Sequence, residues 1–177
     1  MNITARFLTM MMAALSLVAC SSDDDDPGTP ETPVATAISV TYNVALSEDM
    51  VKVADVTVYY VADDAVVKSE KVTAAKWSKP VKVPADKTFG YHIAYAAKPS
   101  VQIDPETSYN IKADVSMSYD VKDQKGASMS MGETQRSFGS AVKGEKVAEF
   151  LSKLATNAAW RWDGESIVKS SFDWNAQ

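Results

Sequence analysis

A strict alternation of apolar and polar side chains over residues 107–122 is the feature that most constrains how this chain folds. Successive side chains of a β-strand point to opposite faces of the sheet, so a period of two indicates a strand with one face in the core and the other in water. The pattern therefore predicts a long antiparallel strand. Its apolar face holds Tyr109, Ile111, Ala113, Val115, Met117, Tyr119 and Val121.

Similar patterns predict strands along much of the remaining chain. Residues 38–46 alternate in the same way. After a turn at 47–49, residues 51–62 are β-branched or aromatic on both faces, as expected for a central strand. Asp63 and Asp64 favour a tight hairpin into the next strand, because short Asp side chains tolerate the backbone angles of a turn.

Proline and turn residues indicate how these strands end. Pro80 and Pro84 bracket residues 81–83, and because proline cannot donate to a sheet ladder, this piece is expected to be an edge strand or a loop. Residues 89–96 place their large apolar side chains on one face. Residues 123–126 have the composition of a hairpin turn that leads into a further strand.

The apolar period changes near the C-terminus and predicts one helix over about residues 145–159. Its stripe consists of Val147, Phe150, Leu151, Leu154, Ala155 and Ala158. A last strand follows, in which Val168, Phe172 and Trp174 are expected to face inward. We therefore expect residues 34–177 to form a single mainly-β domain, an antiparallel β-sandwich of immunoglobulin-like or related type with one α-helix in its C-terminal half.

The N-terminus has the organisation of a signal peptide over residues 1–19. A short polar stretch with one positive charge, Arg6, precedes an uncharged, largely apolar run at residues 7–19. A membrane-spanning helix needs roughly 20 apolar residues, and this run of 13 is shorter.

The end of this run, Leu17-Val18-Ala19-Cys20, resembles the lipobox of bacterial lipoproteins. The resemblance implies cleavage before Cys20, alkylation of its thiol by a diacylglycerol and acylation of its new amino group, so that fatty-acyl chains such as palmitate hold the protein in a membrane. Cys20 is the only cysteine, so it has no partner for a disulfide within the chain. The alternative is an ordinary secretory signal that ends near a cysteine.

Residues 20–33 are expected to be a disordered acidic and proline-rich tether. Its first residues are Ser21, Ser22, Asp23, Asp24, Asp25 and Asp26. A Ser/Asp-rich run directly after the lipidated cysteine resembles the export signal of Bacteroidetes surface lipoproteins. The resemblance implies a lipid anchor in the outer membrane with the domain exposed at the cell surface. A solvated spacer is the alternative, and the leaflet of the outer membrane stays open.

The charge balance of the domain argues against a nucleic-acid partner. From Val34 onward the chain holds 17 basic and 18 acidic residues, a net charge of −1, so the formal −5 of the whole chain belongs mostly to the tether. The basic residues are scattered, whereas nucleic-acid binding requires a basic patch.

The sequence holds no strong catalytic or metal-binding motif. Lipidation consumes Cys20, and His92 is the only histidine, so a cysteine nucleophile, a catalytic triad and a zinc site are all disfavoured. Paired carboxylates, Asp163 with Glu165 or Asp114 with Asp120, leave a small hydrolase as a weaker hypothesis. We expect no enzyme activity, no cofactor and no metal.

Three tryptophans are the candidate ligand-binding residues. Trp160 and Trp162 are two positions apart, so in an extended segment they share one face and can either pack in the core or form a stacking platform for a sugar ring. Trp77 lies beside Lys76 and Lys79 and is the second candidate.

These features predict a non-catalytic lipoprotein domain for binding or display at the cell surface. The resemblance of the N-terminus to Bacteroidetes surface lipoproteins implies an accessory role in an outer-membrane complex that handles glycans. The implied partner is a glycan or an outer-membrane protein. The alternative is a structural or adhesin-like subunit that pairs strands with a neighbour. Exposed Trp/Tyr clusters favour the first function and an unprotected edge strand favours the second.

Overall fold

The computed structural model describes residues 31–174 of the chain. The signal peptide, Cys20 and the Ser/Asp-rich run lie outside these described residues, so the expectations about them stay predictions. From Pro33 onward the described residues belong to one compact unit.

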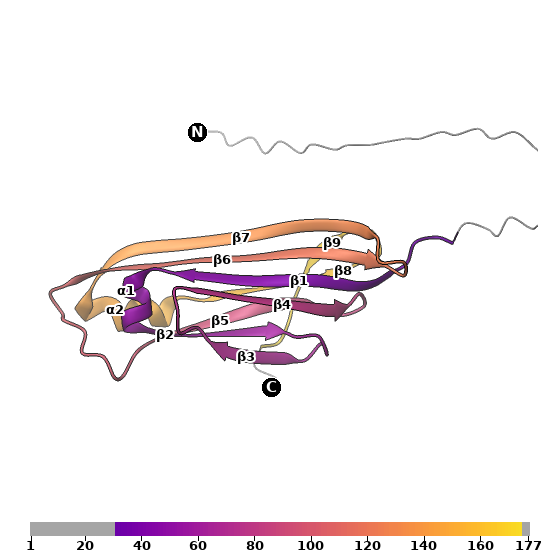
Figure 1. The fold of residues 1–177 in the computed structure, drawn as a ribbon. Coiled ribbons are helices and arrows are strands. Elements are labelled where there is room, and N and C mark those ends of the chain that lie inside the picture. The colour runs from indigo at the N-terminus through magenta and orange to yellow at the C-terminus, as the bar shows by residue number, and fades with distance from the viewer. Residues whose placement is uncertain (1–30, 175–177) are drawn as a thin grey trace, which may run out of the picture. The chain divides into compact units, whose positions relative to one another are not determined.

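The described residues form two antiparallel sheets packed face to face, which confirms the predicted mainly-β sandwich (Figure 1). One sheet has the strand order β4-β1-β6-β7 and the other the order β3-β2-β5-β8-β9. The elements are β1 Ala35–Leu46, α1 Glu48–Val53, β2 Ala54–Val61, β3 Val67–Lys71, β4 Lys76–Pro84, β5 Phe89–Ala97, β6 Ser108–Asp123, β7 Ser128–Lys143, α2 Gly144–Lys153, β8 Thr156–Trp162 and β9 Ile167–Ser170.

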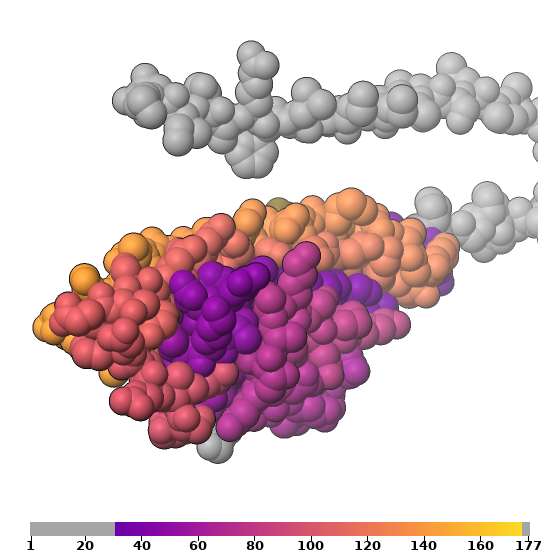
Figure 2. All heavy atoms as spheres, turned by 60° about the vertical axis from the view of Figure 1, so that its left-hand side comes forward, coloured from indigo at the N-terminus to yellow at the C-terminus, as the bar shows by residue number. Residues whose placement is uncertain are grey.

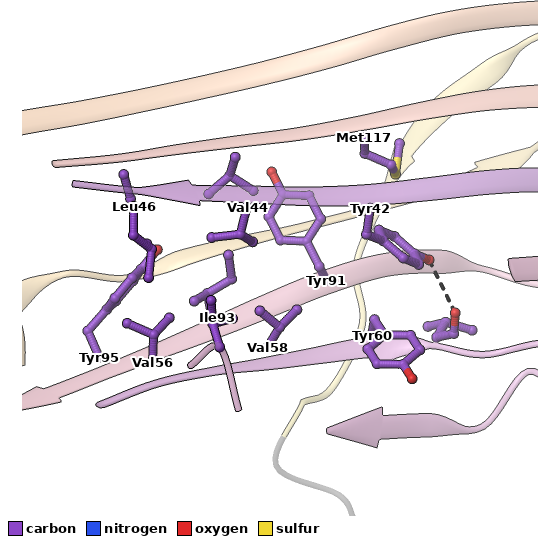
Figure 3. Packing of buried hydrophobic residues seen from close by; sticks show 14 of the residues in the cluster. Tyr42, Val44, Leu46, Val56, Val58, Tyr60, Tyr91, Ile93, Tyr95 and Met117 are labelled. Atoms are coloured by element: carbon purple, nitrogen blue, oxygen red, sulfur yellow. Dashed lines mark hydrogen bonds between the residues drawn. The ribbon is translucent and has the colours of Figure 1, made fainter. Parts of the chain in front are cut away.

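The core lies between the sheets, where alternate residues of β1, β2, β5 and β6 face one another (Figure 3). Tyr42 of β1 is 1% exposed and extends across the interface toward β2 and β5. Its hydroxyl donates to the carbonyl oxygen of Val61 at 3.3 Å and accepts from the backbone N–H of Gly90 at 3.2 Å. This one side chain therefore joins a strand of one sheet to two strands of the other.

The alternating segment is confirmed as β6, whose apolar side chains from Ile111 to Met117 are buried. The proline-bracketed segment belongs to β4, which is an edge strand as expected. Gly126 in the predicted hairpin turn has a φ of 81°, a left-handed conformation that glycine adopts without strain.

The predicted turn and strand at residues 47–62 were partly wrong, because α1 occupies Glu48–Val53 and β2 begins only at Ala54. Ser47 caps the helix, since its side-chain oxygen accepts from the N–H of Met50 at 3.3 Å. Met50 and Val53 are three positions apart and both are buried. Together with the connection between β5 and β6, α1 covers one end of the sandwich (Figure 2).

The predicted C-terminal-half helix is present as α2, but its predicted range of 145–159 was too long. α2 ends at Lys153, and residues from Thr156 onward form β8, which pairs with β5. Val147 and Leu151 are buried on the predicted stripe, whereas Ala155 and Ala158 lie outside the helix. Within residues 31–174 neither helix is long and apolar enough to cross a membrane.

The expected inward orientation was wrong for Val168, whereas Phe172 and Trp174 are half-buried and contact buried residues of the core. In β9, Val168 lies opposite Arg161, on the outer face, whereas Ile167 lies opposite Trp162 on the core side. The strand ends at Ser170, before Phe172 and Trp174. The segment that carries these two residues crosses the five-stranded sheet toward the C-terminus (Figure 1).

Candidate functional site

A row of three polar or aromatic side chains crosses the outer face of the five-stranded sheet. Tyr59 of β2 lies opposite His92 of β5, which lies opposite Asn157 of β8. The neighbouring Tyr91 and Ile93 are buried in the core, so the alternation of the strand directs His92 outward. Tyr59 and His92 are half-buried and Asn157 is exposed.

The C-terminal segment adds two rings to this row and completes what we call the aromatic cluster: Tyr59, His92, Phe172 and Trp174. The Tyr59 and His92 ring centroids are 5.6 Å apart, and Trp174 stacks on His92 at 6.2 Å with an interplanar angle of 28°. Phe172 lies 4.6 Å from Trp174. These centroid separations are those of favourable aromatic pairs.

Small residues beside His92 make room for the cluster. The outward-facing positions before and after it in β5 are Gly90 and Ala94, so a large ring can lie flat over this part of the sheet. Gly90 also lets β5 and β8 approach closely, because a Cβ added there would collide with the backbone carbonyl of Ala158. Gly90 thus permits the pairing that sets Asn157 beside His92.

A hollow of about 380 Å³ adjoins the cluster where β9 ends, and we call it the C-terminal hollow. Because the pairing of β8 with β9 stops at Ala159 and Ser170, β8 and the departing chain enclose a space between them. The hollow is large enough for a small ligand such as one sugar ring. Its lining consists of Asn157, Ala158, Ala159, Trp160, Lys169, Ser170, Ser171, Phe172 and Trp174.

His92 is neutral at pH 7 in this setting. Burial disfavours its charged form and lowers the pKa of the imidazole below its usual value of 6.5. Its Nδ1 atom is buried without a hydrogen-bond partner among the described residues. The row therefore presents a neutral, flat ring between Tyr59 and Trp174, not a cation.

Of the two tryptophans predicted to form a pair, Trp160 packs in the core. It is 8% exposed, and its ring lies 6.3 Å from that of Phe89 and 6.0 Å from that of Tyr91. Trp162 shares its face of β8 and is half-buried against the core. This burial favours packing over an exposed platform for the pair, although Trp160 also lines one wall of the C-terminal hollow.

Trp77 is held by a polar cluster at the edge of the sandwich. Its indole N–H donates to Glu70 Oε2 at 3.0 Å, while Lys79 Nζ and the Tyr60 hydroxyl donate to Glu70 Oε1, each at 2.6 Å. These hydrogen bonds, that of Lys79 first, lower the pKa of Glu70 to about 2. The interactions tie β3 to β4 and hold the indole ring in place, and Trp77 also lines a second hollow of about 300 Å³.

The carboxylates considered for hydrolysis lie in separate surroundings. Asp114 pairs with Lys112 at 3.2 Å and Asp120 with Lys122 at 2.6 Å, while Asp163 accepts the N–H groups of Glu165 and Ser166 in a turn. The hydrogen bonds lower the pKa of all three, whereas a general acid needs a raised one. Over the part of the chain that the structure describes, no three His, Cys, Asp or Glu side chains are grouped to hold a metal ion.

The sequence alone did not reveal the aromatic cluster. Tyr59 and His92 are 33 positions apart, and only the register of β2 against β5 brings them together. Phe172 and Trp174 have the same spacing of two as Trp160 and Trp162, but that signal does not tell an inward pair from an outward one. The position of Phe172 and Trp174 depends on where β9 ends, and no local sequence pattern marks that end.

We expect the single imidazole to titrate below pH 6.5, because burial against Trp174 and Tyr59 opposes protonation. Above that pH both the folded and the unfolded chain are neutral at His92, and as the pH falls the unfolded chain takes up the proton first. Stability is thus lost between pH 6.5 and the lower folded pKa. An NMR titration measures this pKa, and urea unfolding of the wild type and His92→Gln at pH 7.5 and 5.5 measures the loss. A midpoint at or above 6.5 would contradict the arrangement.

Comparisons with known protein families, with curated proteins and with solved structures find no match. The site consists of four rings on the outer face of a sheet, an adjoining hollow, and the exposed amide of Asn157.

Proposed function

We propose that this chain is a non-catalytic binding domain of a cell-surface lipoprotein and that the aromatic cluster with the C-terminal hollow binds a saccharide. One observation carries the proposal: Trp174 stacks on His92 and also lines the hollow, so a ligand that enters the hollow meets a flat ring. The role follows the glycan-binding function predicted from the sequence, but its stacking ring is Trp174, and of the predicted pair only Trp160 lines the hollow.

The chemistry of the site suits a sugar better than a purely apolar ligand. A sugar ring has C–H faces that pack on aromatic rings, and hydroxyl groups that need both donors and acceptors. Phe172 and Trp174 supply rings, while Asn157, Ser170 and Ser171 supply an amide and two hydroxyls around the same space. A few polar groups beside apolar walls are typical of small-molecule sites.

The anchor is proposed from the N-terminal sequence. The lipobox ending in Cys20 supplies the lipid attachment, and the Ser/Asp-rich run supplies the export signal of the outer-membrane lipoproteins that it resembles. A domain held at the surface in this way meets large extracellular ligands before they cross the outer membrane. The accessory role in an outer-membrane complex rests on this location.

Replacement of Cys20 tests the anchor. Cys20→Ala should abolish lipidation, because the thiol is the acceptor, and stable membrane association should be lost with it. Metabolic labelling with a fatty-acid analogue, followed by membrane fractionation, measures both. Ser22→Ala is the matched control and should keep the label. Equal labelling of the Cys20→Ala protein and the wild type would contradict the proposed anchor.

A second candidate function is strand pairing with a neighbouring protein, as in a structural or adhesin-like subunit. Its support is β7, a strand of 16 residues at the edge of the four-stranded sheet. Two features of β7 oppose it. First, Arg136 lies opposite Val115, on the core side of the strand, and a charged residue that points inward protects an edge strand against pairing with another chain. Second, Gly132 and Gly139 weaken the strand. Saccharide binding is therefore the favoured function.

Replacement of Trp174 tests saccharide binding. A glycan array with the mature lipoprotein in detergent identifies the saccharide, and calorimetry measures its affinity. Trp174→Ala should weaken binding more than tenfold, about 1.4 kcal/mol or more, because it removes the ring that faces the hollow. Trp174→Phe keeps a flat ring and should retain most of the affinity.

Thermal unfolding controls for loss of structure, and Trp174→Ala should melt close to the wild type because the ring is only half-buried. Absence of any saccharide ligand, or unchanged affinity of a correctly folded Trp174→Ala protein, would exclude this function.

A further inference from the structure

We propose that the aromatic cluster and the C-terminal hollow select sugars that carry an acetamido group, and that Asn157 is the residue that recognises this group. The inference rests on the proposed function and adds the class of sugar. An acetamido group, which replaces a hydroxyl group in N-acetylated amino sugars, has a carbonyl acceptor, an N–H donor and a methyl group. The site offers an amide to the first two and an apolar corner to the third.

The register of β8 directs the Asn157 side chain to the face on which the aromatic cluster lies. Asn157 lies opposite His92, and the next residue, Ala158, lies opposite the buried Tyr91. Because successive side chains of a strand alternate, Asn157 and His92 both point away from the core. Side chains directly opposite each other in an antiparallel pair are about 5 Å apart at Cβ. The short side chain of Asn157 therefore holds its amide beside the imidazole, at the wall of the hollow.

The amide of Asn157 is free to bind a ligand. The residue is exposed, and within residues 31–174 its side chain makes no hydrogen bond. Asn43, which faces outward from the other sheet, already accepts from Ser78 and donates to Ser116. A side-chain amide has two N–H donors and one carbonyl acceptor, so that of Asn157 can donate to the acetamido carbonyl oxygen or accept from the acetamido N–H.

An apolar corner next to this amide receives the methyl group. Ala159 is the next outward-facing residue of β8, because it lies opposite Gly90, and it lines the hollow together with Phe172 and Trp174. The two rings lie 4.6 Å apart and belong to the aromatic cluster on the same outer face as Asn157. A methyl group against these rings is removed from water, whereas a hydroxyl group there would lack a partner. The corner thus favours acetamido over hydroxyl.

Charge does not enter this discrimination. His92 is neutral at pH 7, because burial lowers the pKa of its imidazole. Among the described residues that line the hollow, Lys169 alone is charged, but it lies opposite Trp160, so its side chain leaves on the core side of β9. Hydrogen bonding and apolar contact remain, and salt does not screen them as it screens ion pairs. The preference should therefore not depend on ionic strength.

The experiment compares two pairs of sugars by calorimetry with the mature lipoprotein: N-acetylglucosamine with glucose, and N-acetylgalactosamine with galactose. Within each pair only the group at carbon 2 differs, acetamido or hydroxyl. In at least one pair the wild type should bind the acetamido sugar roughly tenfold more tightly, as expected for one buried methyl group and one added hydrogen bond. The preference should be the same in about 0.5 M salt.

Asn157→Asp should abolish this preference. The carboxylate has the size of the amide but cannot donate to the acetamido carbonyl oxygen, whereas a sugar hydroxyl can still donate to the carboxylate. The affinity for glucose and galactose should therefore be retained. Asn43→Asp is the matched control, because it makes the same chemical change on the outer face of the four-stranded sheet, and it should leave the preference unchanged.

The outcomes separate this inference from the function on which it rests. Equal affinity within both pairs, or a preference that persists in Asn157→Asp, would overturn the role of Asn157 while saccharide binding stands. If neither pair binds, the glycan array decides: a best ligand that carries an acetamido group and loses affinity in Asn157→Asp supports the inference, and one without that group overturns it. With a blank array the proposed function fails, and the inference fails with it.

Discussion

The hydroxyl group of Tyr42 is the interaction on which the arrangement of the two sheets depends. It lies in the centre of the core, where burial raises its pKa far above the usual value, so it remains a neutral donor at any physiological pH. It bonds to Val61 in β2 and to Gly90 in β5, and these bonds fix β1 against two strands of the other sheet. Apolar packing alone lacks this directionality, because the hydrophobic effect is non-directional.

The position of the candidate site follows from that constraint. Gly90 donates its backbone N–H to the Tyr42 hydroxyl and, because it has no side chain, allows the close approach of β8. It lies two residues before His92. Once β5 is fixed between β2 and β8, Tyr59, His92 and Asn157 line up on the outer face, and the C-terminal segment packs its rings against them. A core interaction on one face of β5 thus organises a binding surface on the other.

Local patterns predicted the strands of this fold much better than they predicted the site. The alternation over β6 and the prolines of β4 are properties of a few neighbouring residues, and both predictions hold. The end of α2 was not predictable in this way, because residues from Thr156 leave the helical pattern in order to pair with the distant β5. The aromatic cluster depends in the same way on register and on where β9 stops. Ser47 is a local N-cap signal for α1, but the β-branched residues that follow it favoured the prediction of a strand.

The most direct test of the account is to follow the aromatic signals of the protein by NMR during titration with the saccharide that it binds. The chain has one histidine and four tryptophans, so the ring signals can be assigned individually. We expect the signals of His92 and Trp174 to shift in a saturable manner, while those of Trp77 and Trp162, which do not line the hollow, stay unchanged. Saturable binding that shifts Trp77 or Trp162 and leaves His92 and Trp174 unmoved would contradict the assignment of the site.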